Sequence, residues 1–182
     1  MGSQLLVLNL PLLLLVGWAA VIDVRSRRIP NWLTLTAVIT GLAQAYFIDG
    51  GLTLGGSVKG LLAGFGLPFV LFAFRILGAG DVKLLAGIGA WIGAWPVVVV
   101  ILAAAALGGV LGLLQGMWQG RLPALLRNTF LLAANLMNVK RLGVPQGPAG
   151  GQGTKTARDT LPYAVPILIA TALVLVAGPA LA

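Results

Sequence analysis

Residues 74–95 read FRILGAGDVKLLAGIGAWIGAW, and they place one carboxylate between two apolar runs. Asp81 follows a Gly-Ala-Gly tripeptide directly and stands at the head of the second run. A charged side chain is costly near the hydrocarbon of a bilayer, so an aspartate at this position needs a reason. The flanking Gly78 and Gly80 predict that one helix ends here and that another begins near Asp81.

Apolar runs also fill most of the remaining chain. Of the 182 residues, 59% are hydrophobic and only 9% are charged. Because a helix needs about 20 apolar residues to cross the hydrocarbon core, the sequence predicts an all-α polytopic membrane protein. We expect one membrane-embedded domain over residues 1–182 with six crossing helices, at about 4–24, 31–48, 55–77, a short helix from about 81, 97–119 and 160–180.

Local signals mark some of the expected helix boundaries. Pro30 disfavours helical geometry at Ile29, and Asn31 can cap the second helix. Trp91 and Trp95 stand at the end of the short fourth helix, where we expect both rings at headgroup depth.

Basic residues predict the orientation of the helices. The chain carries a net charge of +8, and most of its Lys and Arg residues flank one set of helix ends. The positive-inside rule makes that side cytoplasmic, so six crossings put both termini outside. On the inner side, residues 121–160 are expected to form an amphipathic segment followed by a flexible Gly/Pro-rich loop. Since this rule accounts for the charge, the expected partner is the lipid bilayer rather than nucleic acid.

Several catalytic classes lack the residues that they need. The chain has no cysteine and no histidine, which excludes disulfides, thiol nucleophiles and catalysis by a Ser-His-Asp triad. No metal site and no cofactor are expected. Ser57 and Lys59 do not suit a Ser-Lys peptidase, because positions two apart on a helix face different ways.

The four acidic residues are all aspartates, and two of them have simple structural explanations. Asp49 lies in an Asp-Gly-Gly turn, and Asp159 lies where it can cap the last helix. Asp23 ends the first helix and Asp81 starts the fourth, so the topology brings both to one membrane depth. A structural alternative stays open, in which Asp23 pairs with Arg27 at i+4 and Asp81 caps its helix.

Two carboxylates at one depth permit a definite chemistry. If they face each other across a water molecule, they cannot both ionise cheaply, so the pair shares one proton. One carboxylate then takes a proton from water while the other donates a proton to a peptide carbonyl oxygen. Helix dipoles alone favour an ionised Asp81 as the resting base and a neutral Asp23 as the resting acid. In this interpretation Gly78 and Gly80 leave room for a substrate backbone beside Asp81.

Three segments carry a specific combination of motifs: DVRSRRIPNWLTL (23–35), GAGDVKLLAGIGAWIG (78–93) and LPYAVPILIA (161–170). This combination resembles the bacterial type IV prepilin peptidases, which are membrane aspartic peptidases of the GxGD type. The resemblance implies Asp23 and Asp81 as the catalytic pair. It also implies supporting roles for motif residues, namely Pro30, Asn31, Gly78, Gly80, Lys83, Pro162 and Tyr163.

The resemblance implies an activity and a location. Family members remove a short, positively charged leader from pilin-like precursors at the cytoplasmic face of the bacterial inner membrane. Larger members also carry paired Cys-x-x-Cys motifs and N-methylate the mature pilin. Because this chain has no cysteine, it is similar to the short, peptidase-only enzymes of tight-adherence (Flp) pilus systems, and no methyltransferase activity is expected.

Other interpretations remain open. An archaeal-type preflagellin peptidase fits the same motifs. A proton-coupled carrier or a scaffold subunit of a secretion system would use the aspartates as relay groups or as caps. Glycines repeat at four-residue spacing in 56–64 and 108–120, which suits either a homo-oligomer interface or packing inside the helix bundle.

Overall fold

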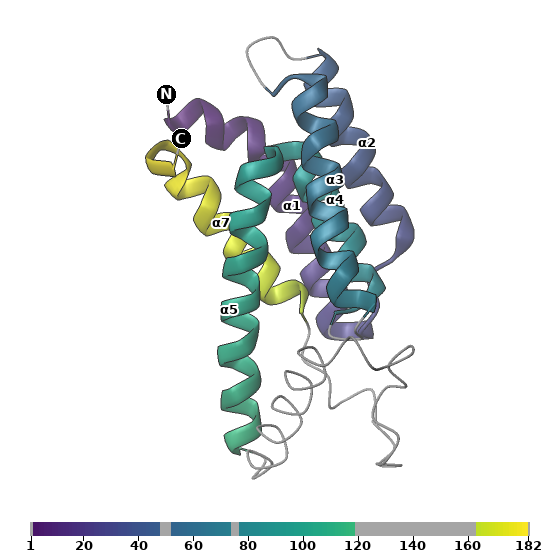
Figure 1. The fold of residues 1–182 in the computed structure, drawn as a ribbon, viewed down its shortest axis with the longest axis vertical. Helices are drawn as coiled ribbons and strands as arrows, with labels where there is room; N and C mark the ends of the chain where they lie inside the picture. Colours follow the sequence, from purple (N-terminus) through teal and green to yellow (C-terminus); the bar gives the residue numbers. More distant parts are fainter. Residues whose placement is uncertain (1, 48–51, 74–76, 119–162, 182) are drawn as a thin grey trace, which may run out of the picture. The chain divides into compact units, whose positions relative to one another are not determined.

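The computed structural model describes residues 2–47, 52–73, 77–118 and 163–181. The described residues form six helices: α1 (Gly2–Ser26), α2 (Asn31–Phe47), α3 (Leu54–Ala73), α4 (Ala79–Ile92), α5 (Ala94–Trp118) and α7 (Ala164–Leu181) (Figure 1). The all-α prediction is confirmed. The predicted amphipathic segment and loop at 121–160 lie outside the described residues.

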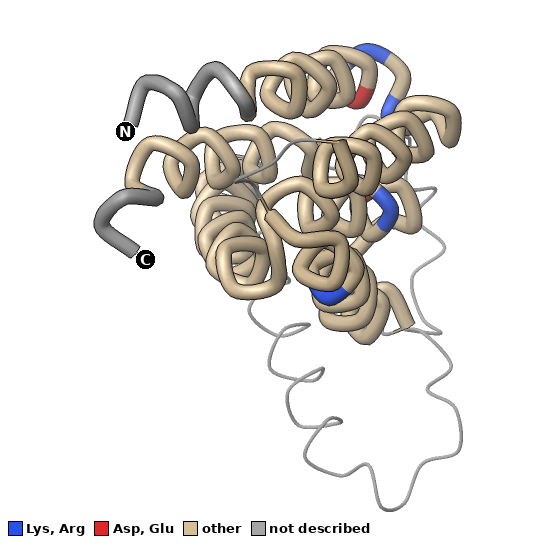
Figure 2. Tube along the Cα trace, turned by 90° about the horizontal axis from the view of Figure 1, so that it is seen from above, with Lys and Arg blue, Asp and Glu red and all other residues tan. Residues whose placement is uncertain are grey.

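Among the described residues, three helices are long and apolar enough to cross a membrane. The candidate spans are Asn9–Ser26, Leu54–Ala73 and Ala94–Gln115, and Ala164–Ala177 is a shorter apolar stretch. Figure 2 shows how few charged positions the described helices carry, with acidic positions beside basic ones. A polytopic membrane protein fits these findings, whereas six complete crossings stay a prediction.

Helix α4 is short because it lies in the protein interior. Ten of its fourteen residues are buried, and it packs against α2 and α3. Its fourteen residues reach only about 21 Å at 1.5 Å per residue, less than the hydrocarbon thickness of about 30 Å. Surrounded by protein, α4 does not need the length of a lipid-exposed span.

Glycines let the three helices approach closely. A Cβ added to Gly60 of α3 would overlap the carbonyl oxygen of Gly89 of α4, and one added to Gly64 would overlap that of Leu85. At this contact Ser57 is buried, and its hydroxyl donates to the Ala90 carbonyl at 2.6 Å. The α3 glycines therefore pack inside the chain, as small residues do between membrane helices, rather than forming a homo-oligomer interface.

The two tryptophans near the end of α4 differ in environment. Trp91 is buried, and its indole N–H donates to the Ala37 carbonyl of α2 at 2.9 Å. Trp95, in the first turn of α5, is exposed. The prediction that both rings lie at headgroup depth stays a prediction, and α2 supplies a partner for the indole N–H of Trp91.

Helices α1 and α7 form a second packed pair. The start of α1 and the end of α7 lie at the same end of the helices (Figure 1). The end of α1 and the start of α7 therefore approach each other at the opposite end. Asp23 lies there, one turn from the end of α1.

The chain divides into two compact units, residues 1–106 with 162–182, and residues 107–161. Helices α1 to α4, the first half of α5 and α7 belong to the first unit. Of the second unit, the structure describes only the end of α5, residues 107–118. The single domain expected over residues 1–182 stays a prediction.

Candidate active site

Two helices from separate packed groups each contribute one buried carboxylate. Asp23 of α1 is 8% exposed and Asp81 of α4 is 9% exposed. Fifty-seven residues separate them in the sequence, from 24 to 80, so only the packing of α1 and α4 can bring them together. Buried carboxylates are rare unless they are paired or functional, so each needs a partner.

Gly78 shapes the backbone around Asp81. It precedes α4 with φ −79° and ψ 150°, an extended conformation that any residue can adopt. Its backbone N–H donates to the Asp81 carboxylate, and a Cβ added to Gly78 would lie 2.9 Å from Asp81 Oδ2. A side chain at this position would therefore displace the Asp81 carboxylate, and the glycine supplies space rather than a left-handed turn.

Gly80 has a different neighbour. A Cβ at this position would lie 3.1 Å from Cβ of Ile29, in the connection between α1 and α2. Gly80 thus lets that connection pack against the start of α4. The expected room for a substrate backbone at these two glycines stays a prediction.

The Asp81 carboxyl group is strongly perturbed. Burial, and then the negative charge of Asp23, raise the pKa of Asp81 from 3.8 to about 7, although the Gly78 N–H bond opposes the change. The effect of Asp23 means that the two carboxylates lie close enough to interact across the helices. The packing of α1 against α4 agrees with such an interaction.

The start of α7 completes the surroundings of both carboxylates. The backbone N–H of Ala164, the first residue of α7, donates to Asp23 Oδ2 at 3.3 Å. Tyr163 is half-buried, and its hydroxyl donates to the Ala104 carbonyl of α5 at 3.3 Å. Burial and the charge of Asp81 raise the pKa of the Tyr163 hydroxyl. Residues 163–164 therefore lie beside both carboxylates.

Sequence reasoning missed the Ala164 donor because it belongs to the backbone. A signal for it did exist, since the first N–H groups of every helix lack partners within the helix and must find one elsewhere. Asp23 supplies that partner from another helix. Asp159, which was expected to cap the last helix, lies outside the described residues, as do Asp49 and Pro162.

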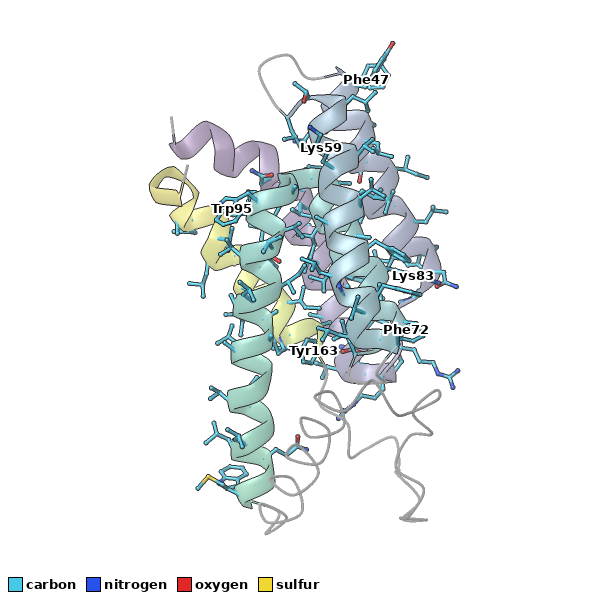
Figure 3. The ribbon with its side chains drawn as sticks, in the orientation of Figure 1. Phe47, Lys59, Phe72, Lys83, Trp95 and Tyr163 are labelled. Carbon is cyan, nitrogen blue, oxygen red and sulfur yellow. The ribbon has the colours of Figure 1, made fainter. Side chains whose placement is uncertain are left out.

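Asn31 and Lys83 contact each other beside the site. The Lys83 ammonium donates to Asn31 Oδ1 at 2.9 Å, and both side chains are exposed. Lys83 and Tyr163 lie toward the same end of the helices as Phe72, opposite to Lys59 (Figure 3). The structure thus brings two of the motif residues together, and it directs Lys83 to an amide rather than to a carboxylate.

The predicted cap of α2 is wrong. Asn31 is the first residue of the helix, and its side chain is bonded to Lys83. Instead, the Pro30 carbonyl accepts the N–H groups of Leu33 and Thr34 at 3.2 and 3.4 Å. Pro30 is favourable at this position because it lacks an N–H that would need a partner.

Other chemistries find less support among the described residues. No three carboxylates or imidazoles in that part of the chain come together in a way that could hold a metal ion. Ser57 is buried and bonded to a carbonyl, whereas Lys59 is exposed, so the two do not form a Ser-Lys pair. The arrangement that remains is a pair of buried carboxylates, one of them able to hold a proton at neutral pH.

Known proteins share this region of the chain. Residues 10–113, which include both aspartates, match the type IV leader peptidase family. The prepilin leader peptidase/N-methyltransferase of Escherichia coli (strain K12) is 39% identical over 101 residues, covering 50% of this chain and 43% of that protein. The protein of the same name from Aeromonas hydrophila is 34% identical over 111 residues, covering 55% and 38%.

A more extensive alignment has a similar identity. The prepilin leader peptidase/N-methyltransferase of Dichelobacter nodosus is 32% identical over 125 residues, covering 63% of this chain and 43% of that protein. The matches therefore span less than half the length of these curated relatives. No solved structure matches the chain.

Proposed function

Because the chain belongs to the type IV leader peptidase family, whose model matches residues 10–113, we propose that it is an aspartic endopeptidase. It removes the leader of pilin-like precursors at the cytoplasmic face of the bacterial inner membrane. Asp23 and Asp81 are the catalytic pair. The observation that carries this proposal is the burial of one carboxylate on each of two packed helices, α1 and α4, where the charge of Asp23 acts on Asp81.

The pair hydrolyses a peptide bond with one shared proton. The ionised carboxylate takes a proton from water while the water oxygen bonds to the scissile carbonyl carbon. The carbonyl π electrons move to its oxygen, which receives the proton of the neutral carboxyl group. The resulting gem-diol collapses and the C–N bond breaks. The nitrogen takes the proton that the first carboxylate had removed from water, and a gem-diol hydroxyl returns a proton to the second carboxylate. The products are a carboxylic acid and an amine, and the dyad again holds one proton.

We assign the resting proton to Asp81. A helix dipole is worth less than about one pKa unit, whereas the pKa of Asp81 is raised from 3.8 to about 7. Burial therefore outweighs the dipole of α4. Asp23 is the resting base, and its Oδ2 accepts the Ala164 N–H bond, as suits a negatively charged oxygen. This assignment reverses the one that helix dipoles alone favoured.

Exposed cations near the two aspartates support the expected orientation. Arg25 and Arg28, both exposed, follow Asp23 closely in the sequence, and exposed Lys83 lies two residues after Asp81. The positive-inside rule assigns this end to the cytoplasm. The start of α1 and the end of α7 then lie outside (Figure 1).

Two finer features belong to the same proposal. The precursor is of the Flp type, and residues 1–182 do not methylate the product, since they contain no cysteine. An archaeal-type preflagellin substrate is the alternative. Incubation of the purified protein with S-adenosylmethionine and cleaved pilin tests the second feature, and a methylated N-terminus would contradict it.

Carrier and scaffold functions are tested by the same substitutions as the peptidase. The experiment co-expresses the chain with an Flp-type precursor, and mass spectrometry scores removal of the leader. We expect Asp23→Asn and Asp81→Asn each to abolish cleavage while the protein still accumulates in the membrane. Asp49→Asn and Asp159→Asn serve as matched controls and retain cleavage. Cleavage by both Asp23→Asn and Asp81→Asn would contradict the proposed function.

A further inference from the structure

Arg27, directly after α1, has an unusual backbone. Its φ is 54°, the left-handed region, where it is the one non-glycine residue among the described parts of the chain. Its N–H donates to the Asp23 carbonyl at 2.8 Å. Left-handed geometry after a helix favours glycine, and a strained residue of another type tends to mark a functional position.

The side chain of Arg27 is unusual as well. Its Nη1 atom is buried and has no hydrogen-bond partner among the described residues. The guanidinium nevertheless lies close enough to Asp23 for the two charges to interact. Buried donors in folded proteins are nearly always paired, so an unpaired guanidinium nitrogen is expected to meet a group that arrives later.

Neighbouring cations do not share these features. Arg25 and Arg28 are exposed, and Lys83 is bonded to Asn31. Arg27 therefore combines a left-handed backbone, a free buried donor and proximity to a proposed catalytic carboxylate. A structural helix terminator would require only the first of these features.

We propose that Nη1 of Arg27 donates a hydrogen bond to the scissile carbonyl oxygen of the substrate, an inference that rests on the proposed peptidase function. A carbonyl oxygen has two lone pairs, so it can accept from Arg27 and from Asp81 together. When water attacks, the carbonyl electron pair moves to this oxygen, and the guanidinium stabilises the developing charge without giving up a proton. A neutral carbonyl suits the position better than an anion, because Asp23 and Asp81 lie close by.

The geometry suggests a variant that keeps the fold. Arg27→Gly removes the donor and places at φ 54° the residue that tolerates this conformation best. Arg28→Gly is the matched control, since it makes the same change at an exposed, non-helical neighbour. Both purified variants are assayed on a pilin-like precursor, with thermal unfolding measured in parallel.

We expect Arg27→Gly to lower kcat by about 10²–10³-fold, as loss of one oxyanion donor does, with an unfolding midpoint no lower than that of the unaltered chain. Millimolar guanidinium ion should restore part of the activity. Arg28→Gly should stay within about threefold, since it removes no buried donor. A kcat for Arg27→Gly within threefold of the unaltered chain would overturn the inference.

Arg27→Lys tests the geometry of the donor. Lysine keeps the positive charge and can donate hydrogen bonds, but it lacks the planar fork of the guanidinium, so we expect kcat to remain at least about tenfold low. Full recovery would mean that the position of Nη1 is not needed, and the assignment of the donor to this atom would be refuted. If the unaltered chain leaves the precursor intact, the proposed function fails and this inference fails with it. Failure of the inference alone leaves cleavage by the unaltered chain in place.

Discussion

Replacing Asp81 with asparagine should abolish activity and yet make the fold more stable at alkaline pH. Burial, and then the negative charge of Asp23, raise the pKa of Asp81 from 3.8 to about 7, so between these values the folded protein holds a proton that the unfolded chain releases. Folding stability therefore falls as pH rises, by about 1.4 kcal/mol per pH unit. From pH 5 to pH 8 the loss from this group is about 3 kcal/mol, because it stops once pH passes about 7.

Asparagine resembles the protonated carboxyl group and does not titrate. The measurement is thermal or denaturant unfolding in detergent micelles at pH 5 and pH 8, for the unaltered chain and for Asp81→Asn. We expect the stability advantage of the variant to grow by about 3 kcal/mol over this interval. Asp49→Asn is the control for loss of one carboxylate. An equal pH dependence for Asp81→Asn and the unaltered chain would refute the reasoning, because Asp81 would then titrate near its ordinary value.

Three further substitutions test the packing around the site. Gly60→Ala should destabilise the fold by at least about 2 kcal/mol in unfolding experiments, because the added Cβ meets the backbone of α4. Gly66→Ala is the control and should not lower stability, since its Cβ meets nothing within 4 Å. Equal effects of the two substitutions would exclude the close contact. Gly78→Ala should lower kcat at least about tenfold with little change in stability, since the methyl group displaces the Asp81 carboxylate; unchanged kinetics would contradict this. Trp91→Phe should cost about 0.5–1.5 kcal/mol by removing the indole N–H bond to the Ala37 carbonyl, which keeps the Thr40 hydroxyl as a partner; no loss in denaturant unfolding would exclude that contribution.

Much of the fold could be predicted because membrane helices are long apolar runs, and glycine, proline and charged residues mark their ends. The predicted range 31–48 matches α2 closely, as 97–119 matches α5. Signals that depend on neighbours were less informative. Tryptophan is a typical interfacial anchor, but the indole N–H of Trp91 donates to a carbonyl of α2. Asparagine is a typical helix cap, but the side chain of Asn31 accepts a hydrogen bond from Lys83.

The two aspartates could be named from the sequence, since so few charges interrupt the apolar runs and the motifs around them are specific. The sequence alone could not decide which of the two carboxyl groups holds the proton. The helix dipole is a local property and favoured an ionised Asp81, whereas burial depends on the helices that cover it. A buried carboxyl group responds to desolvation more strongly than to a dipole, which is why we propose Asp81 rather than Asp23 as the resting acid.

The sequence by itself determined the helical class, the expectation of a membrane environment and the identity of two candidate acids, because these follow from composition and from order along the chain. Only the tertiary structure decided that the Ala164 N–H bonds to Asp23, that Asp81 is buried at the head of α4, and that Arg27 keeps a buried donor free. The reason is physical. Hydrogen bonds and desolvation depend on which atoms meet, and residues 23, 81 and 164 meet only when α1, α4 and α7 are packed.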